Sequence, residues 1–189
     1  MKTMNRSEFM KCCTLGMCSC VATLAFSAPQ AAVAQANNPE ADRLKSQLEA
    51  VRIRYAKLVS VLDESLDEPT RKKILESLGR ECAKQFGSET FEKYRGDIKG
   101  FLKSIQEPGK WVEKAEFDEA AGSIRIIDKA QKCSCPLVEK GLTPSSQCDC
   151  TLGWQKETYS AILGKPVEAE VEESILRGGQ RCVFRIKVV

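Results

Sequence analysis

Residues 164–189, GKPVEAEVEESILRGGQRCVFRIKVV, decide the fold class. Apolar residues at positions 167, 169 and 171 alternate with glutamates, and apolar residues at 182, 184, 186 and 188 alternate with mainly basic residues. An alternation with period two is typical of a β-strand that buries one face. The stretch therefore predicts two strands, joined through a turn at Arg177-Gly178-Gly179.

Upstream of these strands the sequence predicts one helix and two further strands. Thr151 to Leu163 has a helical pattern that ends at Gly164, with Pro166 just beyond. Residues 111–117 and 124–127 are short apolar stretches around Ala120-Ala121-Gly122, which indicates a hairpin. We expect the four strands to form an antiparallel meander with one inserted helix.

Three helices are predicted before the sheet, over Asp42–Leu66, from about Pro69 to Phe86, and from about Ser88 to Ile105. The first has a stripe at Leu44, Leu48, Val51, Tyr55, Leu58 and Leu62, and the second has a face of Ile74, Leu78, Cys82 and Phe86. The stripe could pair with a partner helix, including that of a homodimer, but its shortness favours packing on its own domain. The fold class is therefore α+β: N-terminal helices packed on a small antiparallel sheet.

The first 36 residues have the features of a cleavable signal sequence. Basic residues come first, an uncharged run follows from Cys12 to Ala28, and Ala32-Val33-Ala34-Gln35-Ala36 offers small residues for cleavage. Asn5-Arg6-Ser7-Glu8-Phe9-Met10-Lys11 is similar to a twin-arginine signal, with Ser7 in place of the second arginine. We expect export by the twin-arginine or general secretory machinery, to the bacterial periplasm or outside the cell. An uncleaved membrane anchor is the alternative.

Composition limits the function of residues 37–189, which we expect to form a single domain. The whole chain has 29 basic and 26 acidic residues, of which the first 36 residues contain three and one. The remaining 26 basic and 25 acidic residues give a net charge of +1, so no excess of positive charge favours a nucleic acid partner. The chain has no histidine, which excludes Ser-His and Cys-His nucleophile pairs and every histidine-containing metal site.

Paired cysteines are the main candidate site. Cys133-Ser134-Cys135 and Cys148-Asp149-Cys150 are separated by twelve residues, and Cys182 lies on the last strand. Disulfides suit an oxidising compartment, whereas four thiolates could instead hold zinc or an iron–sulfur cluster. A reactive thiolate, activated by Lys132 or by the start of the following helix, is a third interpretation.

Further candidates are less specific. Cys82 could belong to the same site or be a small core residue, and Asp149 could assist the cysteines or belong to a turn. Four aromatic residues could line a ligand pocket or belong to the core: Trp111, Phe117, Trp154 and Tyr159.

The order of features from Cys133 onward resembles the 4-vinyl reductase domain family. The features are the paired cysteines, Cys150 to Trp154 opening a helix, Gly164 to Val167, and Gly178 to Phe184 before the C-terminus. The resemblance implies an α/β sandwich around an apolar pocket, as in the effector-sensing domains of regulators that respond to aromatic compounds. It also implies a structural zinc, with Cys182 as the best-matched ligand and Cys148 and Cys150 next. Glu173 and Ser174 stand where relatives have a cysteine.

Three functions follow as hypotheses. The first is an exported domain that binds a small ligand or metal ion at a cysteine cluster. The second is a cysteine-dependent enzyme, such as a small hydrolase or a thiol oxidoreductase. The third is a structural or interaction protein stabilised by disulfides, for which six cysteines allow fifteen pairings.

Overall fold

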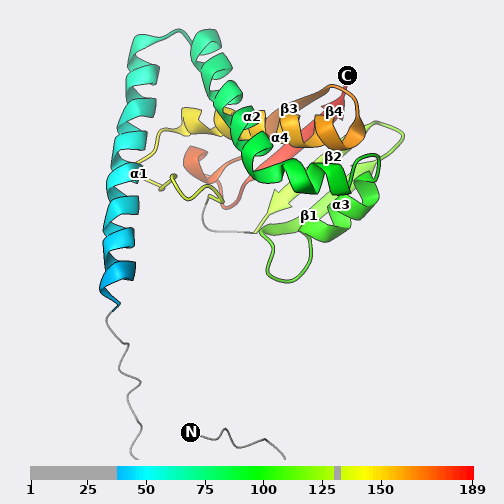
Figure 1. The fold of residues 1–189 in the computed structure, drawn as a ribbon. Helices are drawn as coiled ribbons and strands as arrows, with labels where there is room; N and C mark the ends of the chain where they lie inside the picture. Colours follow the sequence, from blue (N-terminus) through cyan, green and yellow to red (C-terminus); the bar gives the residue numbers. More distant parts are fainter. Residues whose placement is uncertain (1–37, 130–132) are drawn as a thin grey trace, which may run out of the picture. The chain divides into compact units, whose positions relative to one another are not determined.

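The computed structural model describes residues 38–129 and 133–189, and Asn38–Val189 form one compact unit. The elements follow the chain in this order (Figure 1): α1 (Pro39–Ser65), α2 (Glu68–Lys93), α3 (Ile98–Ile105), β1 (Val112–Asp118), β2 (Ser123–Asp128), α4 (Cys148–Leu163), β3 (Val167–Glu173) and β4 (Val183–Val188). The predicted α+β class is confirmed. The predicted signal sequence lies outside the described residues, and none of the helices that the structure describes is long and apolar enough to cross a membrane.

The four strands form one antiparallel sheet with the order β1-β2-β4-β3. The predicted meander is therefore wrong, because β4 inserts between β2 and β3 instead of adding at the edge. Two rows of apolar side chains cross the sheet on its inner face, and between them a row of charged side chains crosses the outer face. The inner rows are Phe117–Ile124–Ile186–Ala169 and Ala115–Ile126–Phe184–Val171, and the outer row is Glu116–Arg125–Arg185–Glu170.

The hydrophobic core lies between the inner face of the sheet and helices α2, α3 and α4. Tyr159 and Ile162 of α4 are fully buried there, and the ring of Phe101 from α3 packs edge-on against Tyr159 at 5.8 Å between centroids. The predicted period-two strands thus supply one side of the core, and the inserted helix supplies much of the other.

Helices α2 and α4 cross with their backbones in direct contact. A Cβ atom at Gly79 would lie 1.8 Å from the carbonyl oxygen of Cys150, and one at Gly153 would lie 2.0 Å from that of Glu76. Only glycine lets two helices approach so closely, since any side chain would overlap the opposite backbone. This crossing sets the position of the whole of α4 against α2.

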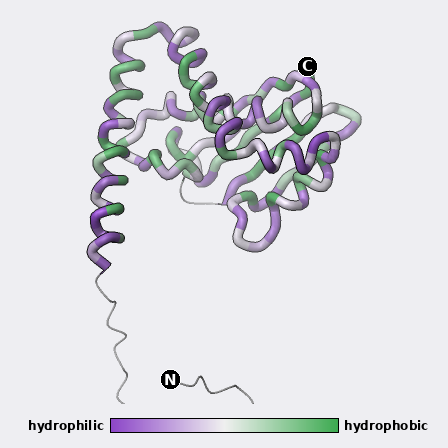
Figure 2. Tube along the Cα trace, viewed as in Figure 1, coloured by the Kyte–Doolittle hydropathy of each residue, from purple (hydrophilic) through white to green (hydrophobic). Residues whose placement is uncertain are grey.

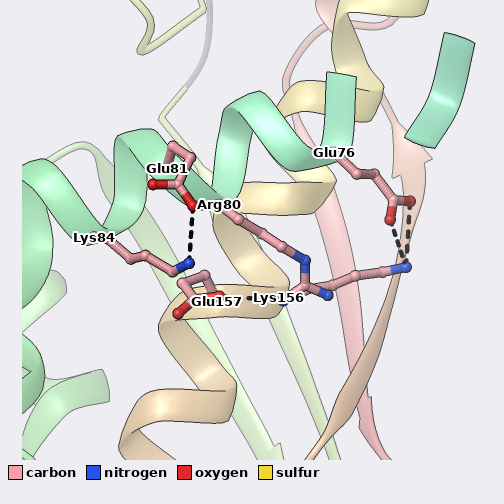
Figure 3. Close-up of polar contacts among 6 residues, drawn as sticks. All are labelled: Glu76, Arg80, Glu81, Lys84, Lys156 and Glu157. Atoms are coloured by element: carbon pink, nitrogen blue, oxygen red, sulfur yellow. Dashed lines mark hydrogen bonds and ion pairs between the residues drawn. The ribbon is translucent and has the colours of Figure 1, made fainter. Parts of the chain in front are cut away.

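Ion pairs flank the glycine crossing (Figure 3). Arg80 of α2 lies 3.2 Å from Glu157 of α4. The largely buried ammonium of Lys156 lies 3.1 Å from Glu76 on α2. It also lies 2.8 Å from Glu168 on β3. Lys156 therefore joins both helices to the edge of the sheet, and its burial makes these charges more strongly coupled than surface pairs.

The apolar face predicted for the second helix is wrong. Phe86 is 73% exposed, and Ile74 and Leu78 are exposed as well. The buried residues lie one position further along, at Leu75, Gly79, Ala83, Gly87 and Phe91. Small residues face the core here because the close approach of α4 leaves room for nothing larger.

The predicted break at Gly87 is also wrong. Helix α2 continues through Gly87, which packs against the ring of Phe91, and ends at Lys93. The chain turns instead at Gly96, where φ is +77°, a conformation that favours glycine. The carboxylate of Asp97 then accepts a hydrogen bond from the backbone N–H of Gly100 and caps α3.

Helix α1 forms where predicted, but most of its apolar stripe does not pack on the domain: only Tyr55 and Leu62 of the six residues are half-buried. Leu44, Leu48, Val51 and Leu58 are exposed, and the buried side chains are those of Ala56 and Val59. Figure 2 shows apolar and polar segments alternating along the whole helix. Pairing of this stripe with another helix, including that of a second copy, stays a prediction.

Replacing Gly79 or Gly153 with alanine should force the two helices apart. We expect each substitution to lower the free energy of unfolding by more than about 2 kcal/mol, because the new methyl group meets backbone that cannot move aside. Chemical denaturation monitored by circular dichroism measures this. Gly100→Ala is the matched control, since its methyl group meets only the exposed carboxylate of Asp97, which can move aside. Its expected loss is limited to the weakened cap of α3, about 1 kcal/mol. Equal losses in all three variants would contradict the crossing.

Candidate functional site

Helix α4 starts three residues earlier than predicted, so Cys148 and Cys150 both lie in its first turn. Successive residues of an α-helix are rotated by about 100° around its axis, so residues two positions apart are rotated by about 200°. The two thiols therefore point to opposite sides of the helix. This rotation divides the six cysteines of residues 38–189, all of which are free thiols, between two places.

The first place lies where α1, α2, α4 and the loop 133–147 meet. The Tyr55 hydroxyl donates a hydrogen bond to Gln147 at 2.7 Å, and both residues lie beside Cys150. Burial, and then the charges of Cys82 and Cys135, raise the pKa of Cys150, which places the three cysteines in the same region of the domain. All three cysteines are half-buried.

The second place lies between α4, the turn after β3 and the start of β4. The Cys148 sulfur lies 3.0 Å from the hydroxyl of Ser174. Burial raises the pKa of Cys182, and the backbone of the next residue after Ser174, Ile175, opposes that shift. Charges on Cys182 and Cys148 both raise the pKa of Cys133. Ser174 stands at a position where the resemblance implies a cysteine. It contacts Cys148 directly, one of the cysteines predicted to bind zinc.

A single site of four thiolates does not fit this arrangement. Each Cys-x-Cys pair sends one sulfur to each place, so the four paired cysteines do not converge. Among the residues that the structure describes, no three cysteine, aspartate or glutamate side chains are grouped so that they could hold a metal ion. Zinc or an iron–sulfur cluster stays a prediction that this geometry does not support.

Burial favours the protonated form of four of the thiols by raising their pKa. It raises the pKa of Cys133 and of Cys150 from 9.0 to about 11, and it raises the pKa of Cys82 and of Cys182 as well. A nucleophilic cysteine needs the opposite shift, because the thiolate is the reactive form. Lys132, the predicted activating residue, lies outside the described residues.

Two carboxyl groups lie close to the cysteines. Asp149, in the first turn of α4, is buried, and burial raises its pKa against the opposing charges of Lys72, Arg71 and Arg177. Sequence reasoning missed Asp128 at the end of β2, whose pKa burial raises from 3.8 to about 7. The signal was present: an aspartate directly after Ile126-Ile127, on a strand predicted to lie in the sheet.

The four aromatic candidates do not share one pocket. Trp111 is 55% exposed, Tyr159 is fully buried in the core, and Trp154 packs at the edge of the core. Phe117 alone among the four lines a described groove, of about 500 Å³, between α3 and β1. Leu102 and Ala115 share its floor with Phe117, and Lys99, Lys103, Gln106 and Glu107 form its rim.

Gln106 joins the two walls of the groove. Its amide nitrogen donates to the carbonyl of Leu102 at 2.7 Å, and its amide oxygen accepts from the backbone N–H of Ala115 at 2.9 Å. Both bonds hold the end of α3 against β1, so the groove is part of the folded frame and not a loop feature.

Comparison with known proteins shows the fold but no family: no family model and no curated protein matches. A trafficking protein particle complex subunit 3 from Naegleria fowleri, covalently bound to palmitic acid, shares 18% identity over 77% of this chain and 96% of its own, with a TM-score of 0.51. The phenol-responsive sensory domain of the transcription activator PoxR, with phenol, shares 14% identity over 72% and 74%, with a TM-score of 0.50. At these identities the likenesses establish the α+β fold alone.

A third solved structure belongs to the family named by the resemblance. It is a vinyl-4-reductase family protein from Methanocaldococcus jannaschii, with 18% identity over 77% of this chain and 94% of its own. Its TM-score of 0.36 is too low to carry an argument. The predicted fold is therefore supported by the two stronger likenesses and by the elements themselves.

The raised pKa of Asp128 predicts a pH-dependent stability. Because the pKa is about 7 in the folded chain against 3.8 ordinarily, the protonated form is favoured on folding, and this stability is lost as the pH rises from about 4 to 7. Asp128→Asn removes the buried charge, so it should stabilise the domain by about 2 kcal/mol at pH 8. The gain should shrink towards pH 4, where the native carboxyl is already neutral. A gain independent of pH, in denaturation curves at both values, would contradict the assignment.

Proposed function

We propose that the domain binds a small molecule with an apolar body and one acidic, oxygen-bearing end. The observation that carries this proposal is the groove between α3 and β1. Its floor of Leu102, Ala115 and Phe117 is apolar. Its rim carries the ammonium groups of Lys103 and of Lys99, which pairs with Glu119, against the single carboxylate of Glu107. Its volume of about 500 Å³ lies in the range of small-molecule sites.

The fold likenesses support the same class of ligand. One similar structure holds phenol and the other palmitic acid. Both molecules combine an apolar body with a single acidic oxygen group, although one is compact and the other extended. A groove with an apolar floor and a basic rim suits this chemistry, because the floor buries the body while a lysine pairs with the anion.

The other hypotheses receive less support from the geometry. The raised pKa values of the thiols disfavour a cysteine nucleophile at neutral pH. The separation of the two cysteine places disfavours a shared metal site. Export remains part of the proposal on the strength of the first 36 residues, and an exported binding domain would meet its ligand outside the cytoplasm.

Titration of the full chain with phenol and with decanoic acid tests this function. We expect decanoic acid to bind at pH 8, and Lys99→Gln combined with Lys103→Gln to weaken it by about 3- to 10-fold, since two rim charges are lost. Isothermal titration calorimetry measures both. Phe117→Ala should weaken both probes by removing part of the apolar floor.

Lys187→Gln is the control for the change of charge. Lys187 lines a separate hollow with Arg125 and Arg185, and its substitution should leave the affinity unchanged. Equal weakening by the rim and control substitutions would mean unspecific attraction of the anion. The absence of binding by both probes at millimolar concentration would overturn the proposed function.

A further inference from the structure

The cysteines allow an inference that does not depend on the proposed ligand groove. We propose that Cys82, Cys135 and Cys150 form a three-thiol site that takes one internal disulfide and attaches one low-molecular-weight thiol. The second group, Cys133, Cys148 and Cys182, stays separate from it. We call these the outer and the inner thiol sets, because the inner set contains Cys148 and Cys182, which are only 6% and 8% exposed.

Contacts of one face of α1 gather the outer set. Arg52 donates a hydrogen bond through Nε to the carbonyl of Pro136 at 2.7 Å, next to Cys135 in the chain. Tyr55, one turn further along α1, donates to Gln147 at 2.7 Å, one turn before Cys150. Figure 1 shows the loop that contains these residues reaching the middle of α1.

The glycine crossing brings the third thiol to the same place. The carbonyl of Cys150 lies against Gly79, where a Cβ atom would be 1.8 Å away. Cys82 follows Gly79 by three residues, so it lies on the neighbouring turn of α2. Three elements therefore each contribute one half-buried thiol.

The geometry of the helix prevents exchange between the sets. Cys148 and Cys150 point to opposite sides of α4, being about 200° apart around its axis. Cys148 is held on its own side by Ser174, 3.0 Å from its sulfur. A bond within this Cys-x-Cys pair would also need a strained ring. Because each set has an odd number of thiols, pairing within a set always leaves one thiol over.

The chemistry needs an external disulfide, such as oxidised glutathione, as the electron acceptor. One thiol of the outer set loses its proton and attacks it as the thiolate, forming a mixed disulfide and releasing one glutathione thiol. Because burial raises the pKa of Cys82 and of Cys150, this step is slow at neutral pH and becomes faster as the pH rises. A second thiol of the set attacks the mixed disulfide, which forms the internal disulfide and releases the other glutathione. The third thiol then attacks another oxidised glutathione, keeps one half as an adduct and releases the second half.

Disulfide mapping of the full chain tests the proposal. The reduced protein is equilibrated with oxidised glutathione, free thiols are alkylated, and the peptides are fragmented by mass spectrometry so that each cysteine is identified. We expect one internal disulfide and one glutathione adduct among Cys82, Cys135 and Cys150. We expect Cys135→Ser to retain a Cys82–Cys150 disulfide and to lose the adduct.

Cys133→Ser is a matched control two residues away, and it should leave both products of the outer set unchanged. A disulfide between Cys133 and Cys135, or between Cys148 and Cys150, would overturn the proposal. So would identical maps for the two serine variants, or the absence of any adduct in the outer set. Lys99→Gln with Lys103→Gln should not alter the map, which separates failure here from failure of the ligand groove.

Discussion

The structure depends on the contact between α2 and α4 at Gly79 and Gly153. With the Cβ positions of these residues falling 1.8 Å and 2.0 Å from opposite carbonyl oxygens, neither site has room for a side chain. The contact fixes the depth of α4 over the sheet, so it determines which residues of α4 reach the core. It also brings Lys156 within reach of Glu76 and Glu168, which joins two helices and a strand. A wider crossing would leave these charges apart and Tyr159 less well packed.

The same contact explains the division of the cysteines. Since α4 begins at Cys148, its helical rotation already applies to the Cys-x-Cys pair, and the crossing decides which side of the helix faces α2. Cys150 lies on the side of α2, where its carbonyl meets Gly79, and Cys148 meets Ser174 for this one reason. In an extended loop, the two Cys-x-Cys pairs would suggest a single site of four thiolates. Because one of the pairs lies in a helix, its two thiols point to opposite sides, and the cysteines divide into two sets. Spacing alone therefore does not define a metal site; the secondary structure beneath the spacing does.

Hydrophobic periodicity in a sequence records which residues of one element face the same way, and the predictions succeeded where that information was sufficient. Strands β1 to β4 were predictable because alternate residues face one way, and Phe184 and Ile186 are buried as that pattern requires. The buried face of α2 could not be predicted, because Gly79, Ala83 and Gly87 are small and contribute little hydrophobicity to the sequence pattern. The exposed residues Ile74, Leu78 and Phe86 are strongly hydrophobic and indicate the wrong face. The order of the strands depends on how β4 returns between β2 and β3, which no local pattern records. The groove at Phe117 needed the position of α3, and that depended on a turn at Gly96.

Helix α1 shows how far these local constraints extend. Arg52 and Tyr55 donate hydrogen bonds to Pro136 and Gln147, and Asp63 accepts one from Ser146. All three partners lie in the loop between the two cysteine pairs. Ala56 and Val59 are its only buried side chains within the described part of the helix. With so little apolar burial, the attachment of α1 depends on the conformation of this loop. The loop is in turn flanked by the two cysteine pairs, Cys133 with Cys135 and Cys148 with Cys150.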